Sequence, residues 1–445
     1  MPLFPPQTMA RHRSSLLRKK ARVDSSSSAC SMGGTVATRP LPREITSRLA
    51  PELYDHFLNA LNDSKTTLFT CSLVCKAFLH HSRRYLFASV NLRPDLVKFL
   101  SEQAMETIVP FIRSVGLGGG WMREQQHEFN GIISFMTNLD NIRNIHIEAW
   151  SWDYLAPPAA NALLSGQGKL FQTVTVLDLK FIHFPSLAIL CNFASQFSAL
   201  RGLFLDNVTW DKSQNGESKL DLAPPSFLSR LEKLTIRACA CKMVLSWLLT
   251  VVTQDESRLS LLSIRFLSLP EVLVNEVALV NQLLSTIGPA LEHLELGFLA
   301  HSQEDAAVIS AQVASIDLSI HTHLRNLSIH QLTLYQFPRT PSSRTADPSP
   351  CVWLVPLLQR ISSPVLSHLN FGIWLGEETQ LDLIDWHALV RVLKKPMLNT
   401  SLRAMQFNIR GVEEEMDDQV QRWIKNRLRD WGHVDQFQRL HVSFE

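Results

Sequence analysis

The sequence has few of the features that mark secreted or membrane-spanning proteins. Its seven cysteines are odd in number and scattered in spacing, which argues against a disulfide scaffold and for a reducing compartment. No apolar run approaches the ~20 residues that a membrane span requires, and the first ten residues lack the apolar core of a secretory signal. We therefore expect an intracellular protein of the cytoplasm, the nucleus or both, with no membrane partner.

Motifs for catalysis or for binding cofactors are also missing. The glycine cluster at 116–120 is followed by Trp121, where a nucleotide fingerprint needs another glycine. No Walker loop, zinc-protease helix or nucleophile elbow is present, and the pairs Cys71/Cys75 and Cys239/Cys241 lack the second pair that a zinc site requires. A net charge of +2 gives no general attraction to nucleic acid. We predict no catalytic, cofactor-binding or metal-binding residue, no nucleic-acid partner and no enzymatic activity.

A short phrase recurs from Ile112 onward: an apolar residue, two mostly polar ones, then apolar, polar, apolar. The second position is polar in every copy, and the copies follow one another at intervals of about 30 residues. They begin at Ile112, Ile142, Val174, Leu200, Leu231, Leu259, Leu291, Leu324, Leu366, Leu402 and Phe437. Such a series is typical of stacked like units, which present long surfaces to other proteins.

The phrase and the segments between its copies predict an α/β fold. Each phrase fits a short strand with alternate residues facing inward, and the intervening segments often show helical periodicity. One such helical face is formed by Val272, Leu273, Val280, Leu284 and Ile287. We expect a leucine-rich-repeat-like solenoid of parallel strands and helices over residues 96–445, with an exposed loop at 338–350.

Two different segments precede the repeats. Residues 1–40 are rich in serine and basic residues and are predicted to be a disordered tail. The basic cluster at 18–24 fits either an importin signal or a solvated tail. Residues 41–95 are predicted to form a compact helical domain, in which Asp63 or Ser64 caps the second helix. So short a helical segment needs a partner surface, which either the repeats or another protein could supply.

The segment from Leu49 to Leu92 resembles an F-box, especially the F-box-like motif of families expanded in mushroom-forming fungi. Leu49, Pro51, Glu52 and Leu53 match the Leu-Pro-Pro-Glu-Leu opening, with Ala50 in place of the first proline. Residues 71–75 (CSLVC) match the middle of the motif, with Lys76 and Phe78 in place of arginine and tryptophan. The repeats are similar to the degenerate leucine-rich repeats that follow F-boxes in those families, although they lack the usual asparagine or cysteine except at Cys239.

The resemblance implies a three-helix F-box-like unit and a substrate receptor of an SCF-type cullin–RING ubiquitin ligase. A Skp-type adaptor would dock on the F-box, and the repeats would hold the protein to be ubiquitinated. The adaptor contact would fall on Leu49, Pro51, Glu52, Leu53, Phe57, Leu58, Leu73, Val74 and Phe78. The alternative is a free-standing leucine-rich-repeat scaffold without a ubiquitin role, whose N-terminal helices only close the stack.

The surface that would bind the target protein is predicted from strand alternation. Residues flanking the inward apolar pair point to the concave face of a repeat stack, where they either bind a partner or are simply solvated. They are Asp178, Lys180, Phe204, Asp206, Lys233, Arg237, Arg265, His293, Glu295, His330, His368 and Asn370. Because their charges are of both signs, the sequence does not favour one charge class of ligand.

Overall fold

The structure is a computed structural model of the 445-residue chain. It describes residues 50–74, 76–103, 105–118, 126–166, 168, 170–211, 227–239, 241–253, 263–300, 302–334, 351–412, 416–431 and 440–444. The predicted tail at 1–40 with its basic cluster, Leu49, and the predicted loop at 338–350 lie outside these residues. By its internal contacts the chain divides into two units, Met1–Leu53 and Tyr54–Glu445. The boundaries predicted at residues 40 and 95 stay predictions.

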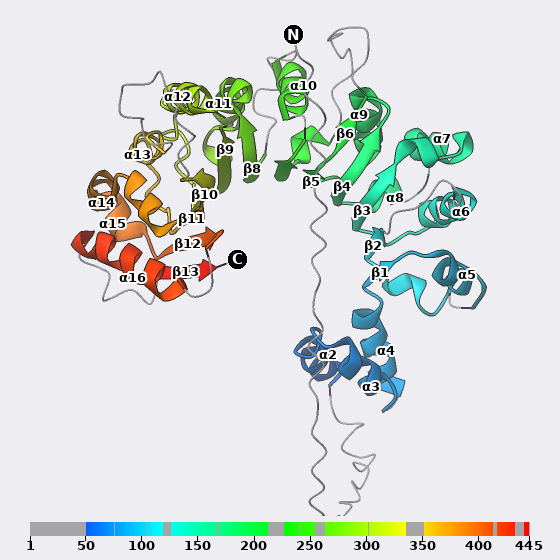
Figure 1. Ribbon diagram of the computed structural model, residues 1–445. Helices are drawn as coiled ribbons and strands as arrows, with labels where there is room; N and C mark the ends of the chain where they lie inside the picture. Colours follow the sequence, from blue (N-terminus) through cyan, green and yellow to red (C-terminus); the bar gives the residue numbers. More distant parts are fainter. Residues whose placement is uncertain are drawn as a thin grey trace, which may run out of the picture. The chain divides into compact units, whose positions relative to one another are not determined.

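In the described part of the second unit, thirteen strands form one sheet in which every pairing is parallel. The strands follow one another in chain order, except that β6 pairs with β4 beside the main path (Figure 1). They are β1 (Ser89–Asn91), β2 (Ser114–Leu117), β3 (Asn144–Ser151), β4 (Val176–Phe184), β5 (Gly202–Asp206), β6 (Thr209–Trp210), β7 (Lys233–Arg237), β8 (Phe266–Leu273), β9 (His293–Leu299), β10 (Asn326–Thr333), β11 (His368–Trp374), β12 (Ala404–Arg410) and β13 (Leu440–Phe444). The predicted α/β class with parallel strands is confirmed.

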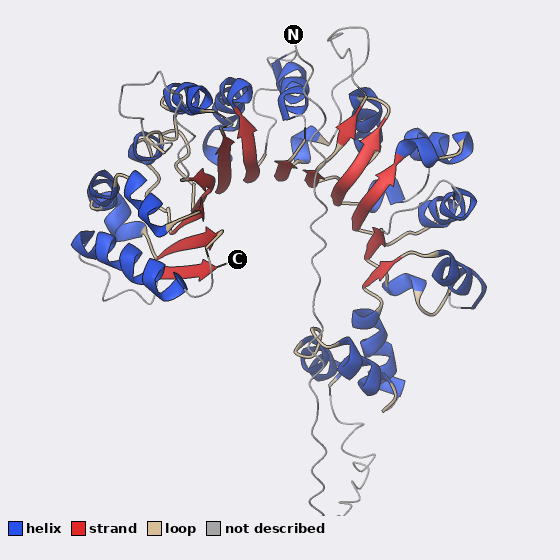
Figure 2. Ribbon diagram, in the orientation of Figure 1, coloured by secondary structure: helices blue, strands red, loops and turns tan. Residues whose placement is uncertain are grey.

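Helices connect most of these strands, and Figure 2 shows them on one side of the sheet. They are α5 (Pro94–Gln103), α6 (Gln126–Thr137), α7 (Pro157–Ser165), α8 (Leu170–Thr173), α9 (Leu187–Ser195), α10 (Cys241–Thr253), α11 (Val277–Ile287), α12 (Gln303–Val313), α13 (Leu354–Gln359), α14 (Trp386–Leu393), α15 (Pro396–Ser401) and α16 (Asp417–Leu428). We call the opposite side the helix-free face, with reference to the described residues. Three further helices, α2 (Pro51–Asn59), α3 (Lys65–Ser72) and α4 (Lys76–Leu86), precede β1.

The recurring phrase places the core between the sheet and these helices. In the units from β2 to β12 its first, fourth and sixth residues are buried, as Ile142, Ile145 and Ile147 show around β3. The alternation follows from the strand period of two, which turns every second side chain toward the helices. One continuous cluster of buried apolar residues extends in this way from Val90 to Trp431.

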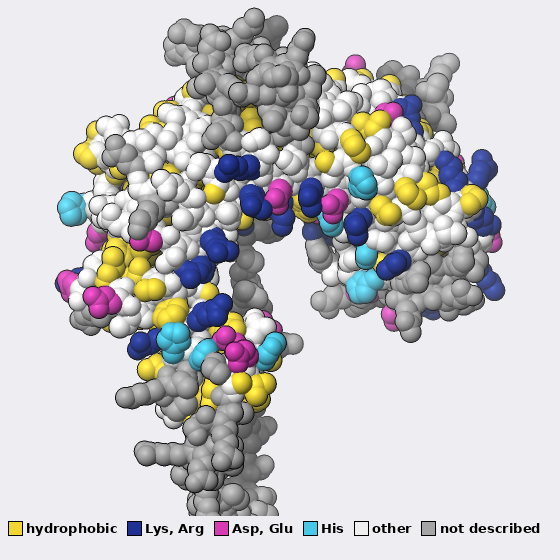
Figure 3. All heavy atoms as spheres, turned by 180° about the vertical axis from the view of Figure 1, so that it is seen from behind, with side chains coloured by type: hydrophobic (Ala, Val, Ile, Leu, Met, Phe, Trp, Pro, Cys, Tyr) yellow, Lys and Arg dark blue, Asp and Glu magenta, His cyan; other side chains and the backbone are white. Residues whose placement is uncertain are grey.

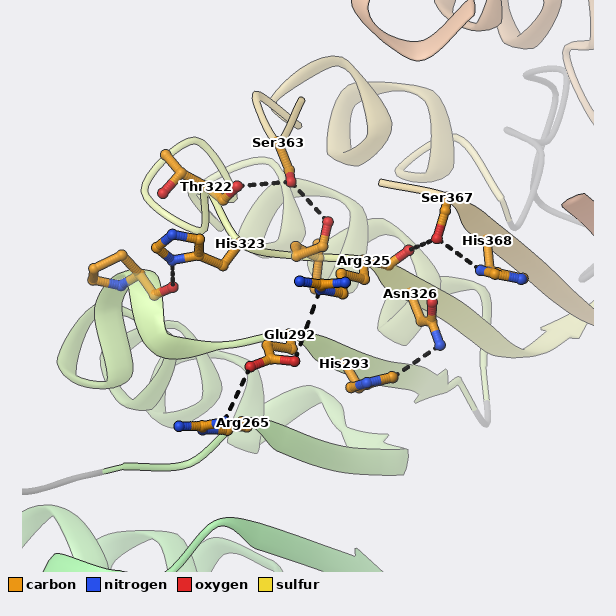
Figure 4. Close-up of polar contacts among 12 residues, drawn as sticks. Arg265, Glu292, His293, Thr322, His323, Arg325, Asn326, Ser363, Ser367 and His368 are labelled. Carbon is orange, nitrogen blue, oxygen red and sulfur yellow. Dashed lines mark hydrogen bonds and ion pairs between the residues drawn. The ribbon is translucent and has the colours of Figure 1, made fainter. Parts of the chain in front are cut away.

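The second residue of the phrase lies at the edge of the sheet, immediately before each strand. There the carbonyl oxygen of one such residue accepts two backbone N–H groups of the next unit, as Arg113 does from Arg143 (2.7 Å) and Asn144 (3.1 Å). The side chains are exposed or half-buried, and Glu292 lies 3.5 Å from Arg265 and 3.9 Å from Arg325 (Figure 4). Basic and acidic side chains form a line in Figure 3. Exposure at this edge explains why the second position is polar.

Strand register corrects one copy of the phrase. Leu267 of β8 pairs with Leu234 of β7 and with Leu294 of β9, so the copy in this unit begins at Ile264, which is fully buried. The copy predicted to begin at Leu259 was therefore five residues too early, and Leu259 itself lies outside the described residues. The helical face predicted from Val272 is also too long, because Val272 and Leu273 belong to β8 and α11 starts at Val277.

Candidate functional site

Helices α2, α3 and α4 are held together by a small set of contacts of their own. Ser64 caps α3 by accepting a hydrogen bond from the backbone N–H of Thr67 (3.3 Å), as the sequence predicted. Tyr54, Leu58 and Leu68 are buried here, yet none of them belongs to the main core cluster that begins at Val90. The helices therefore possess a core that is separate from that of the sheet.

At least three contacts join α2 to α4. The ring of Tyr54 meets that of Phe78 edge to face, with centroids 5.1 Å apart. The carboxylate of Asp55 lies 2.7 Å from Nδ1 of His81, and the hydroxyl of Tyr85 donates to the backbone carbonyl of Asp55 (3.3 Å). Polar and aromatic contacts thus supply part of the cohesion that so small an apolar core lacks.

This helical segment leaves large apolar side chains in solvent. Phe57 of α2, Phe69 of α3, and Leu73 and Val74 of the α3–α4 turn are between 58 and 72% exposed. Leu53, one turn before Phe57 in α2, is 53% exposed. These five residues are among the fourteen exposed large hydrophobic residues of the described chain, although they fall within 22 consecutive positions. Phe57, Phe69, Leu73 and Val74 are called the apolar helical surface below; Figure 3 shows hydrophobic side chains on this segment.

The predicted adaptor-binding residues separate into three groups. Glu52, Leu53, Phe57, Leu73 and Val74 are exposed, as a docking role requires. Pro51 opens α2, and Leu49 lies outside the described residues. Leu58 is fully buried and Phe78 is half-buried against Tyr54, so both belong to the inside of the segment.

Phe69 was not among the residues predicted to contact the adaptor. Phe69 is 58% exposed on α3, next to the buried Leu68. In the sequence Phe69 is only an apolar residue between Leu68 and Thr70 of a short helix. That pattern does not show whether the ring faces the small core or solvent.

The residues predicted to bind the target mostly lie along the helix-free face. Counted from the first residue of each phrase, the predicted residues at positions three, five and seven alternate with buried residues and are themselves partly or fully exposed. Lys233, His293 and His368 occupy position three, and Asp178, Phe204, Glu295 and Asn370 occupy position five. Lys180, Asp206, Arg237 and His330 occupy position seven. Arg265 differs from the others, since it precedes β8 and lies at the sheet edge at position two.

Neighbouring strands connect their polar side chains across this face. The hydroxyl of Ser268 donates to the carboxylate of Glu295 (2.6 Å), and the amide of Asn326 donates to Nδ1 of His293 (2.9 Å). Farther toward β3, Nδ1 of His146 lies 2.8 Å from the carboxylate of Asp178. Burial lowers the pKa of His293, which favours the neutral imidazole that accepts this hydrogen bond.

A pocket of about 340 Å³ opens on the same side of the sheet and extends across strands β5 to β12. We call it the trough. Its lining combines aromatic rings, two arginines and small residues, and comprises Phe204, Thr235, Arg237, Phe266, Ser268, Pro270, Glu295, His330, Gln331, Gly372, Trp374, Asn408 and Arg410. The trough therefore brings together four of the predicted target-binding residues: Phe204, Arg237, Glu295 and His330.

Two residues of the trough, Trp374 and Arg410, were not predicted to bind the target. They are paired across β11 and β12, and the guanidinium of Arg410 lies over the Trp374 ring, 5.8 Å from its centroid. Trp374 is 42% exposed. Both residues occupy position nine, beyond the six-residue phrase, and only the full length of the strands reveals that they belong to the same face.

Several cysteines are buried in the fold. Burial raises the pKa of Cys351 to about 12, and it likewise raises the pKa of Cys191 and Cys241. Because the thiolate is the nucleophilic form, these three residues are poor nucleophiles in the folded protein.

No family model and no curated protein matches this chain. Within the described ranges, no group of three or more His, Cys, Asp or Glu side chains could hold a metal ion. None of the helices in that part of the chain has the length and apolar character needed to cross a membrane.

Proposed function

We propose that this chain is the substrate receptor of an SCF-type cullin–RING ubiquitin ligase and is not itself catalytic. In this proposal the segment containing α2–α4 is an F-box-like unit that docks on a Skp-type adaptor. The sheet and its helices form a leucine-rich-repeat-like solenoid that holds the target protein. The complex would act inside the cell, in the cytoplasm, the nucleus or both.

The apolar helical surface is the observation that carries the proposal. Four side chains that are more than half exposed are unusual for a segment whose own core contains only a few buried residues. Burying each of them against a partner would contribute roughly 1.5–3 kcal/mol. They occur in the segment whose sequence resembles an F-box, where the adaptor would bind.

The regular strand order supports the second half of the proposal. Each described unit from β2 to β12 adds one parallel strand at the end of the sheet, with β6 as a short addition beside β4. The helix-free face thereby presents side chains from many successive strands to a single partner. A free-standing scaffold would share this property. Binding of the adaptor therefore distinguishes the two functions.

The experiment is co-purification of the full chain with a Skp-type adaptor. We expect the unaltered chain to bind, and the double variant Phe57→Asp/Val74→Asp to bind at least about tenfold more weakly, because two charges would enter an apolar interface. Val352→Asp is the matched control, since Val352 is 50% exposed just before α13.

The outcomes separate the two functions. Because the altered residues are exposed, all variants should keep the circular dichroism spectrum of the unaltered chain. Equal adaptor binding by the double variant would contradict the proposed docking surface. Absence of binding by the unaltered chain would favour the scaffold instead.

A further inference from the structure

The floor of the trough is one row of the sheet, at position seven of six consecutive units. From β7 to β12 this row consists of Arg237, Pro270, Gly297, His330, Gly372 and Asn408, and all of these except Gly297 line the trough. The register shifts at two of these places, between Leu269 and Val272 in β8 and between Ile329 and Leu332 in β10. Bulged strands therefore alternate with strands that carry a glycine at the same level.

The glycines make room for the bulges. A Cβ atom on Gly297 would lie 2.0 Å from the carbonyl oxygen of Pro270 in the β8 bulge, so only glycine permits this approach of the two backbones. A Cβ on Gly372 would lie 3.3 Å from Nδ1 of His330 in the β10 bulge. Bulges redirect side chains at binding sites, and Gly372, which lines the trough, adds no side chain to its floor.

An arginine lies on each of the two outer strands of this row, β7 and β12, and the strands between them carry polar side chains into the trough. Arg237 stands at the β7 end, half exposed, with its Nε 3.4 Å from Glu271. Arg410 stands at the β12 end beside the exposed ring of Trp374. A guanidinium has five N–H donors, and its fork matches a carboxylate. Between the ends, Glu295 is engaged with the hydroxyl of Ser268 and lies 4.0 Å from His330.

The separation of the two arginines sets the size of the ligand. Five strand spacings lie between β7 and β12, which amounts to at most ~24 Å along the sheet. A fully extended chain covers that distance with about seven residues. A compact small molecule would reach only part of the row, whereas an extended peptide laid across the strands reaches both ends.

We propose that the trough binds an extended segment of about seven residues from another protein, acidic near both ends and with an apolar side chain against Trp374. The acidic side chains would face Arg237 of β7 and Arg410 of β12, because these are the two arginines that line the trough. That this segment belongs to the ubiquitination target rests on the proposed function; the binding itself does not.

A phage-displayed library of random twelve-residue peptides, selected on the full-length chain, tests the proposal. We expect enrichment of peptides with two acidic residues about six positions apart around a large apolar one. A fluorescein-labelled synthetic copy of an enriched peptide should then bind in fluorescence polarisation. The affinity should fall about tenfold or more when lysine replaces its acidic residues.

Three variants of the chain locate the binding. Arg410→Glu should weaken the labelled peptide by about tenfold or more, and Gly372→Leu should block it by filling the floor. Arg391→Glu is the matched control, because Arg391 is exposed on α14, on the opposite side of the sheet. It should leave the affinity unchanged.

Several results would overturn the proposal. These are a library without an enriched family, enrichment of basic peptides, or peptide binding that survives both Arg410→Glu and Gly372→Leu. Binding of a mixed-sequence single-stranded RNA, lost in the same two variants, would assign the trough to nucleic acid instead. Adaptor co-purification with the trough variants keeps the two hypotheses apart, since it should be unaffected by them.

Discussion

The carboxylate of Glu276 accepts a hydrogen bond from the backbone N–H of Lys242, 34 residues earlier in the chain (2.7 Å). Its other oxygen accepts the backbone N–H of Leu273 (2.9 Å), and the side chain is almost fully buried. Lys242 is the second residue of α10, so a buried anion lies at the N-terminus of that helix. One side chain thus joins the turn after β8 to the helix of the preceding unit.

Glu276→Gln should destabilise the protein by about 1–3 kcal/mol, because an amide can accept one of the two N–H groups but presents its own N–H₂ to the other. The measurement is the midpoint of urea denaturation, followed by circular dichroism. Glu304→Gln is the control, since Glu304 also lies in the first turn of a helix, α12, but is exposed. Equal midpoints for the two variants would contradict this role of Glu276.

His321 should make stability depend on pH. Its ring is fully buried, Nδ1 lies 2.6 Å from the carbonyl oxygen of Gly288, and Nε2 has no hydrogen-bond partner among the described residues. Burial lowers the pKa of His321 in the folded state below the ordinary value of 6.5. As the pH falls below that value, the unfolded chain takes up a proton that the folded chain excludes, so stability is lost on the acid side.

The urea midpoint should accordingly fall between about pH 7 and pH 5, and it should fall less in His321→Asn. The asparagine amide can still donate to Gly288 from nearly the place of Nδ1, but it does not titrate. Each protein serves as its own reference at pH 8, where the imidazole is neutral in both states. Parallel pH curves for the two proteins would show that His321 is not responsible.

Replacing either of two alanines with glycine should stabilise the protein. Ala149 and Ala238 have φ of 55° and 47°, and Phe181, Asn207 and Gln331 have similar values at the same position eight of their units. The left-handed region costs an L-residue about 1–2 kcal/mol, whereas the extra freedom of glycine in the unfolded chain costs about 0.4–1 kcal/mol.

Ala149→Gly and Ala238→Gly should therefore each raise the free energy of unfolding by about 0.5 kcal/mol. Ala307→Gly, on the exposed side of α12, should lower it by about 1 kcal/mol. Thermal denaturation of the three variants side by side measures these changes in stability. Destabilisation by all three would mean that the positive φ angles impose no strain.

Gly297 and Gly131 should respond oppositely to alanine. The Cβ of Gly297→Ala would collide with the backbone oxygen of Pro270, and we expect a loss of about 3 kcal/mol from the forced backbone shift. Gly131 lies in α6 with no described atom within 4 Å of its would-be Cβ, so Gly131→Ala should stabilise the helix by about 1 kcal/mol. Urea denaturation measures both, and a Gly297→Ala variant as stable as the original chain would remove the reason given for this glycine.

The predicted surfaces were only partly accessible from the sequence. Leu53, Phe57, Leu73 and Val74 were expected to be exposed and are, but Leu58, predicted with them, is the centre of the small helical core. Adjacent residues of a short helix can all be apolar, so their types do not show which of them face inward. That depends on where the neighbouring helices cross. For the same reason, the exposure of Phe69 was not predicted from the sequence.

The sequence by itself determined the α/β class, the parallel strands and the buried positions, because a strand period of two converts the recurring phrase directly into an inward face and an outward face. It could not determine the trough. The floor depends on bulges in β8 and β10 lying beside Gly297 and Gly372 of the strands that follow, and Trp374 meets Arg410 only through the register of β11 and β12. Register relates residues that are dozens of positions apart, so only the assembled sheet brings these side chains together.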